Sequence, residues 1–318
     1  MVDAGTIAPA VHHFTDLIPY SHMTTLARVG EQTDILGESP LWDDVSQALW
    51  WVDIRRPALR RLDHATGRID TWPMPDLVGA IALCDDGRLL VALPERIASF
   101  DPRTRALATI ATPPAQVPGH RFNDGRCDRQ GRFWVGTMHN VTRAPEGVLY
   151  RLDVDGSFDA KHGGICIPNS LAWSPDGRTM YFADSLRYTI FAYDFDPVAG
   201  EMRGERVFAT SAQPAFADGS TIDAEGCLWN AEFNGWRVVR YAPDGHVERV
   251  IEVPTHRPTC CAFGGPDLDI LFITTASQQM SADDLARQPL AGSLLAMKAG
   301  VRGLPEPRFP LSKMSPRE

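Results

Sequence analysis

The segment FWVGTM at residues 133–138 is one copy of a short apolar pattern that recurs along the chain and decides the fold. The other copies are WWVDI at 50–54, LLVAL at 89–93, MYFADS at 180–185, LWNAEF at 228–233 and LFITTA at 271–276. Successive copies begin 39 to 48 residues apart. A repeat of about 45 residues carrying four strands is typical of one blade of a β-propeller, so six copies predict six blades.

The sequence around each copy supplies the turns and the remaining strands. Asp-Gly-type turns, which provide the positive φ of a tight hairpin, precede four copies: DDGR at 85–88, RQGR at 129–132, PDGR at 175–178 and AEGC at 224–227. Strand–turn–strand patterns follow, as in LRRLDHATGRIDTW at 59–72, and the best helical candidate is the short SADDLARQ at 281–288. We therefore expect an all-β fold, a six-bladed β-propeller with four antiparallel strands per blade. The recurring apolar segment is expected to be the inner strand of each blade, beside a central channel.

The repeats also predict the domain organisation. Six units fill roughly residues 31–312, and the segment MTTLARVG at 23–30 is a plausible outer strand that completes the last blade from the N-terminal side. We therefore expect one propeller domain over residues 23–318, preceded by an N-terminal extension over residues 1–22.

Composition and charge exclude several classes of function. The formal net charge of −9 argues against a nucleic-acid partner, because binding to a phosphate backbone relies on clustered Lys and Arg. The chain contains no stretch of 18 apolar residues that would cross a membrane. The N-terminal sequence lacks the basic start and apolar run of a signal peptide, which favours a cytoplasmic location. The six cysteines are dispersed, so we expect buried free thiols rather than disulfides or a structural zinc site.

Four polar residues precede the expected inner strands at nearly the same distance. Glu38, Asn123, Asn169 and Asp218 lie 12, 10, 11 and 10 residues before the segments that begin at 50, 133, 180 and 228. Residues at equivalent positions of different blades converge on the propeller axis, and Glu, Asn and Asp offer oxygen ligands suited to Ca, Mg, Mn or Fe(II). Taken singly, each residue is explained equally well by a turn or a solvated loop.

Longer stretches of the chain resemble a known family. The segments LGESPLW at 36–42, RFNDGRCDRQGRFWVGTM at 121–138, NSLAWSPDGRTMYFADS at 169–185 and DGSTIDAEGCLWNAEFNGWRVVRY at 218–241 resemble, in order, the four signature regions of the gluconolactonase/regucalcin (senescence marker protein) family. The segment CCAFGGPDLDILFITTA at 260–276 resembles especially the bacterial pentonolactonase branch. The resemblance implies a six-bladed propeller that holds one divalent cation (Ca, Mg, Mn, Zn or Fe(II)) in its channel and hydrolyses an aldonolactone such as xylono-, arabinono- or gluconolactone.

The resemblance also implies roles for individual residues. Glu38, Asn169 and Asp218 match the metal ligands of the family, and Asp218 also matches its general base. Arg121 and Asn123 match the residues that bind the substrate. The chain departs from many members at two positions: it has Ala217 where Pro is common and Ser170 where Gly is common. Neither change removes a ligand.

Other functions remain open at the level of the sequence. A non-catalytic metal-binding or interaction propeller is one alternative, and a related ester or organophosphate hydrolase is another. The expected partner is a small sugar lactone, and the expected state is a monomer or a small homo-oligomer. His120 and His139 flank the third polar region, and we expect them to form structural hydrogen bonds rather than to act in catalysis.

Overall fold

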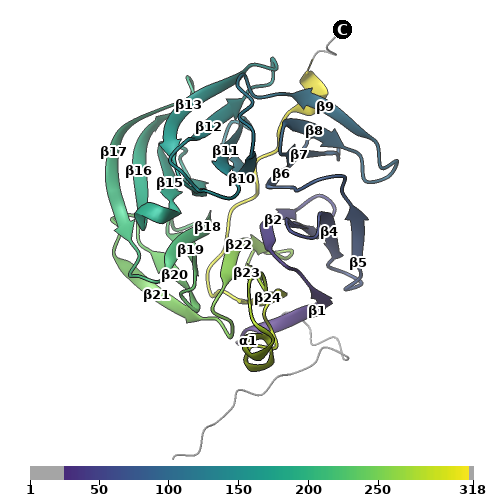
Figure 1. The fold of residues 1–318 in the computed structure, drawn as a ribbon, viewed down its shortest axis with the longest axis vertical. Coiled ribbons are helices and arrows are strands. Elements are labelled where there is room, and N and C mark those ends of the chain that lie inside the picture. Colours follow the sequence, from purple (N-terminus) through teal and green to yellow (C-terminus); the bar gives the residue numbers. More distant parts are fainter. Residues whose placement is uncertain (1–24, 315–318) are drawn as a thin grey trace, which may run out of the picture.

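The computed structural model describes residues 25–314, which form a ring of six four-stranded antiparallel sheets (Figure 1). Blade 1 contains β2 (Gly37–Asp43), β3 (Ala48–Asp53), β4 (Ala58–Asp63) and β5 (Ile69–Pro73). Blade 2 contains β6 (Ala80–Leu83), β7 (Leu89–Leu93), β8 (Arg96–Phe100) and β9 (Leu107–Ala111). Blade 3 contains β10 (His120–Cys127), β11 (Phe133–His139), β12 (Gly147–Leu152) and β13 (Phe158–Ile165). Blade 4 contains β14 (Pro168–Trp173), β15 (Thr179–Asp184), β16 (Thr189–Asp196) and β17 (Glu201–Thr210). Blade 5 contains β18 (Phe216–Ile222), β19 (Leu228–Phe233), β20 (Arg237–Tyr241) and β21 (Val247–Glu252).

Blade 6 joins the two ends of the chain. It consists of β22 (Pro258–Gly264), β23 (Ile270–Thr275), β24 (Ser293–Lys298) and, as its outer strand, β1 (Ala27–Thr33). Strand β1 pairs antiparallel to β24, with Ala27 opposite Ala296. The prediction that an N-terminal strand completes the last blade is therefore confirmed. The extension predicted over residues 1–22 lies outside the described residues.

The position of the recurring apolar segments corrects one prediction. These segments are the second strands of the blades (β3, β7, β11, β15, β19 and β23), and the strand before each of them is the innermost. The first strands of neighbouring blades contact one another all the way around the ring, from β2 to β6 and on to β22 and back. Each second strand is sandwiched between adjacent blades and buried on both faces, so its sequence is continuously apolar. Glu38, Asn123, Asn169 and Asp218 are thus within the innermost strands rather than ahead of them.

Tryptophans of the second strands are anchored by buried aspartates. Trp134 Nε1 donates to Asp128 Oδ2 at 3.0 Å, and Trp229 Nε1 donates to Asp223 Oδ2 at 2.8 Å. In both blades the Asp also accepts backbone N–H groups of the preceding turn. The same side chain therefore fixes the turn and the aromatic core residue.

The remaining expectations concern helix, cysteines and membrane spans. The predicted helical segment forms α1 (Ala282–Arg287), capped by Ser281 in a capping box. Short 3₁₀ turns occur at η2 (Ser185–Arg187) and η3 (Leu311–Lys313). All six cysteines are free thiols, five of them buried, as predicted. Within residues 25–314 no helix has the length and apolarity needed to cross a membrane.

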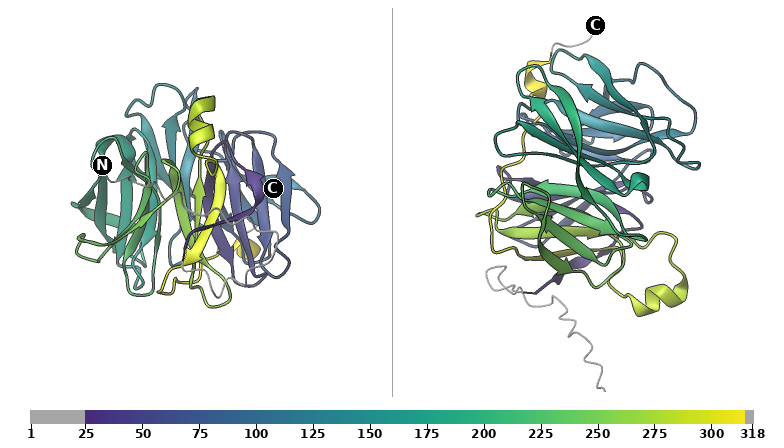
Figure 2. Two further views of the ribbon diagram at one scale, coloured as in Figure 1. Left: turned by 90° about the horizontal axis from the view of Figure 1, so that it is seen from below. Right: turned by 90° about the vertical axis from the view of Figure 1, so that its left-hand side faces the viewer.

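The C-terminal segment after β24 crosses one face of the ring. Gly303 forms a β-bridge with Asp223, and Phe309 forms one with Cys84, so the segment spans from blade 5 to blade 2. Phe309 is completely buried. Figure 2 shows this yellow segment on the face opposite to the loop that carries α1. The channel is therefore covered at one end, and the residues at its other end define the accessible mouth.

Candidate metal and substrate site

A β-bulge interrupts the innermost strand of each blade that carries a predicted site residue. The register with the second strand shifts between Glu38 and Leu41, Phe122 and Gly125, Asn169 and Ala172, and Ala217 and Ser220. Of the two innermost strands without a predicted site residue, β6 pairs with β7 without a shift, whereas β22 shifts against β23 between Pro258 and Cys260. A bulge inserts an extra residue and re-aims the neighbouring side chains.

Glu38 and Asp218 come from blades 1 and 5, and their carboxyl groups are close enough to interact directly. Burial raises the pKa of Asp218 well above its usual range, and the negative charges of Glu38 and Asp124 raise it further. Burial also raises the pKa of Glu38, together with the charge of Asp124. Two acids in contact in a poorly solvated site favour either a shared proton or a bound cation.

Asn169 is held so that its carbonyl oxygen is presented as an acceptor. The Ser185 hydroxyl donates to Ala217 O at 2.7 Å, and therefore accepts from Asn169 Nδ2 at 2.8 Å. This arrangement orients the amide and leaves Asn169 Oδ1 to accept from Asn123 Nδ2 at 3.0 Å. The oxygen of a fixed amide is a ligand suited to a hard cation.

Arg121 and Asn123 complete the other side of the site. Arg121 Nη1 donates to Asn123 Oδ1 at 2.7 Å and to Phe122 O at 2.8 Å, and Nε donates to Asn140 Oδ1 at 3.0 Å. Among the described residues, none accepts a hydrogen bond from Nη2 of Arg121. Both ends of the Asn123 amide are engaged, since Nδ2 also donates to Pro168 O at 2.9 Å. Arg121 therefore keeps a free donor, whereas Asn123 links Arg121 to Asn169.

The donor set fits a divalent cation. Two carboxylates and one oriented amide oxygen converge from three blades, and the contact between the carboxylates is unfavourable unless positive charge compensates it. All three donors are oxygen atoms, which suits hard cations. Glu38, Asn169 and Asp218 together offer oxygen donors of the kind that such an ion binds.

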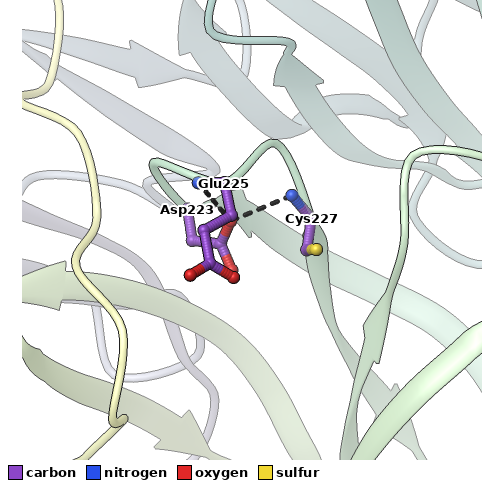
Figure 3. A group of neighbouring side chains, drawn as sticks. All are labelled: Asp223, Glu225 and Cys227. Atoms are coloured by element: carbon purple, nitrogen blue, oxygen red, sulfur yellow. Dashed lines mark hydrogen bonds between the residues drawn. The ribbon is translucent and has the colours of Figure 1, made fainter.

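A second acidic group, Asp223, Glu225 and Cys227, lies in the turn between β18 and β19 (Figure 3). Asp223 Oδ1 accepts the backbone N–H groups of Glu225 and Cys227, both at 2.9 Å. Arg240 already fills the space beside the carboxylates, because its Nε donates to Asp223 Oδ2 at 2.8 Å and its Nη2 donates to Glu225 Oε2 at 2.5 Å. The group is the turn anchor described above for the second-strand tryptophans and does not need a metal.

Sequence reasoning missed several residues that shape the site. Asp124 directly follows Asn123, and its Oδ2 accepts the N–H of Leu171 at 3.0 Å in the next blade. Asn230 Nδ2 donates to Asp218 O at 3.0 Å and to Ser220 Oγ at 2.9 Å, which supports the bulge. Ser185 and Asn230 lie inside the recurring apolar segments and Asp124 lies in the region 121–138, but only the structure identifies their partners.

The two histidines are structural in their observed contacts. His139 Nδ1 accepts the backbone N–H groups of Val141 and Thr142 at 3.2 and 3.1 Å. His120 lies edge-on to His139 and 3.6 Å from Glu146. These contacts hold the loop between β11 and β12.

Comparison with known proteins gives the family. Residues 36–277 match the SMP-30/Gluconolactonase/LRE-like region, and the chain belongs to this family. It is 36% identical to the 6-deoxy-6-sulfogluconolactonase of Pseudomonas putida, over 90% of this chain and 98% of that protein. It is 38% identical to the L-arabinolactonase of Azospirillum brasilense, over 92% and 96% of the two chains. The crystal structure of regucalcin from Agrobacterium tumefaciens, described as a calcium-binding protein, superposes with a TM-score of 0.85 at 32% identity, covering 90% of this chain and 97% of that one.

The two departures from the family pattern are accommodated by the structure. Ser170 adopts a φ of 62°, the left-handed conformation that a glycine would adopt without strain. Its Oγ lies 2.5 Å from Ser220 Oγ, a contact that a glycine could not make. Ala217 is fully buried beside Asp218.

Proposed function

We propose that this protein hydrolyses an aldonolactone with the help of one divalent cation held by Glu38, Asn169 and Asp218. The observation that carries the proposal is the direct interaction of the buried Glu38 and Asp218 carboxyl groups, together with the Asn169 amide that Ser185 and Asn123 orient on the neighbouring innermost strand. Family membership supports the same activity, because two similar proteins are named as sugar lactonases.

Each residue has a definable task. When bound, the cation supplies Lewis acidity that favours attack on the ester carbonyl. Asp218 accepts a proton from the attacking water, Arg121 Nη2 donates to an oxygen of the sugar, and Asn123 holds Asn169 and Arg121 in register. The new C–O bond to water forms as the ring C–O bond breaks, and the proton ends on the released hydroxyl of the aldonic acid.

Five- and six-carbon aldonolactones are the first substrates to consider. The identity to an L-arabinolactonase and to a 6-deoxy-6-sulfogluconolactonase supports arabinono-, xylono- and glucono-type lactones. The metal is Ca, Mg, Mn, Zn or Fe(II), of which calcium has the support of the regucalcin structure.

The test is a hydrolysis assay against arabinono-, xylono-, galactono- and gluconolactone. The protein is chelated first, and each of the five cations is then added back singly. We expect opening of at least one lactone above the spontaneous rate, lost on chelation and restored by a cation. If no lactone opens faster than in buffer with any cation, the enzymatic proposal fails and a non-catalytic metal-binding propeller becomes the better reading.

A further inference from the structure

A cluster of arginines surrounds the accessible mouth of the channel. Arg55 lies in the turn between β3 and β4, and Arg143 lies in the loop between β11 and β12. The two connections follow the ends of β3 and β11. Glu38 pairs with Val52 near the end of β3, and Arg121 pairs with Met138 near the end of β11. Both connections are therefore at the same end of the ring as the site. Blades 1 and 3 thus present two cations toward the opening where Arg121 lies.

Both connections are held in place by specific contacts. The buried Asp53 accepts the backbone N–H groups of Arg55 and Arg56 at 3.1 and 3.0 Å, and those of Ile35 and Leu36 at 2.9 and 3.2 Å. Arg143 has a φ of 53° and its N–H donates to His139 O at 3.3 Å. A non-glycine residue in this conformation persists only where its surroundings hold it, and such residues concentrate at functional sites.

The three arginines are close enough to repel one another. Burial lowers the pKa of Arg121, and the charges of Arg55 and Arg143 lower it further. The pKa of the half-buried Arg55 is also lowered, first by burial and then by the charge of Arg143. Within residues 25–314, the side chains of Arg55 and Arg143 form no hydrogen bond or ion pair. The nearby Arg257, by contrast, donates from Nε to Asn234 Oδ1 at 3.4 Å.

Positive charge concentrates beside Arg121. The side chains of Arg55 and Arg143 interact with it repulsively, and a divalent ion bound in the channel would add two further positive charges nearby. In a protein with a net charge of −9, a local excess of positive charge at the mouth is a departure that a bound anion would relieve.

We propose that Arg55 and Arg143 form a subsite for an anionic substituent of the lactone, so that the preferred substrates are aldonolactones that carry a carboxylate, sulfonate or phosphate group away from the ester. This proposal rests on the proposed lactonase function and specifies its substrate class. Guanidinium groups recognise such groups through paired N–H donors, and Arg121 would bind the sugar oxygens between the anion and the ester.

The experiment compares two lactones that differ only at C6. Glucaro-1,4-lactone carries a carboxylate there, and glucono-1,4-lactone carries a hydroxymethyl group. We expect the wild type to have the higher kcat/KM on glucaro-1,4-lactone, with a KM that rises with ionic strength for that lactone alone. In the Arg55→Gln/Arg143→Gln variant, the ratio of the two kcat/KM values should fall roughly ten- to a hundredfold, as expected for lost hydrogen bonds to a charged group.

The matched control is Arg56→Gln, in the same turn. It removes the same charge, but Arg56 is exposed and donates to Thr33 O at 3.2 Å, away from the cluster. For Arg56→Gln, the ratio of kcat/KM on glucaro-1,4-lactone to kcat/KM on glucono-1,4-lactone should match that of the wild type. The proposal is overturned if the wild type shows no preference for the anionic lactone, if the double variant loses both activities equally, or if Arg56→Gln has the same effect.

Binding of the stable ring-opened acids separates this proposal from the lactonase function. Calorimetry with glucarate and gluconate requires no turnover. Tighter binding of glucarate that is lost in the double variant would support the subsite even if no lactone were opened. Equal binding of the two acids would reject the subsite even if lactones were hydrolysed.

Discussion

The guanidinium of Arg126 and the carboxylate of Glu306 lie 3.1 Å apart although 180 residues separate them in sequence. Arg126 is on the innermost strand of blade 3, and Glu306 is in the C-terminal segment that crosses the ring. Both side chains are 10% exposed. The pair therefore fastens the segment across the end of the channel opposite to the metal and substrate site.

Breaking this pair should destabilise the fold. Glu306→Gln keeps the shape and an acceptor oxygen but removes the negative charge that compensates the largely buried Arg126, whose other hydrogen bond goes to Thr221 Oγ1 at 3.4 Å. We expect a loss of roughly 3 kcal/mol in the free energy of unfolding, measured by urea denaturation. Asp267→Asn is the control, since Asp267 and Arg302 form an exposed pair at 3.8 Å that should contribute at most about 1 kcal/mol. Equal effects of the two substitutions would show that the segment is not fastened by Arg126.

The two acidic groups, Glu38 with Asp218 and Asp223 with Glu225, predict different results in metal binding. Glu38→Ala and Asp218→Ala should retain much less than one ion per chain after loading and desalting, measured by elemental analysis. Glu225→Gln should keep the wild-type content, because Glu225 contacts Arg240 rather than a cation. If Glu225→Gln lost the ion and the other two variants kept it, the metal would bind in the turn between β18 and β19 instead.

Metal binding should also reverse which of two proteins, the wild type or Glu38→Gln, is more stable to thermal unfolding. Without metal, Glu38→Gln should melt above the wild type, because the substitution removes one of two carboxyl groups in contact. With metal at about a hundred times its Kd, the wild type should gain about 2.7 kcal/mol, and the variant much less. Thermal unfolding with and without chelator gives both results. If Glu38→Gln is less stable than the wild type under chelation, the contact between the Glu38 and Asp218 carboxyl groups is not unfavourable and the prediction is wrong.

Asp218→Asn separates the ligand role from the base role. The substitution keeps an oxygen ligand but removes the charge that accepts a proton. Turnover at saturating metal should fall about 10²–10⁴-fold, the usual contribution of general acid–base catalysis. Spontaneous opening of the lactone must be subtracted from each rate. Recovery of the wild-type rate at saturating metal would leave Asp218 only as a ligand.

Arg121→Ala should impair catalysis while the ion stays bound. Loss of a charged hydrogen bond to the substrate should lower kcat/KM about tenfold or more. Asn123→Ala should weaken metal binding as well, because Asn123 donates to Asn169 Oδ1. Metal content and kcat/KM of both variants test this division. Metal loss in Arg121→Ala would show that Arg121 supports the ligands rather than the substrate.

Much of this architecture could be predicted from the sequence alone. The recurrence of segments such as FWVGTM and LWNAEF at propeller spacing indicates the blade number, because every blade buries an equivalent strand. The common spacing of Glu38, Asn169 and Asp218 ahead of those strands is also visible in the sequence. Equivalent positions of a ring must approach its axis, so the predicted residues do lie around the channel.

Other features depend on contacts between blades and could not be predicted. Both the first and the second strands are largely apolar, so only the sheet order shows that β2 rather than β3 is innermost. The interaction of Glu38 with Asp218 and the approach of Arg55 to Arg143 both join segments that are distant in sequence. A local pattern determines which residues form a strand and which face is buried. Ring closure alone determines which side chains from different blades contact one another, and here those contacts form the candidate site.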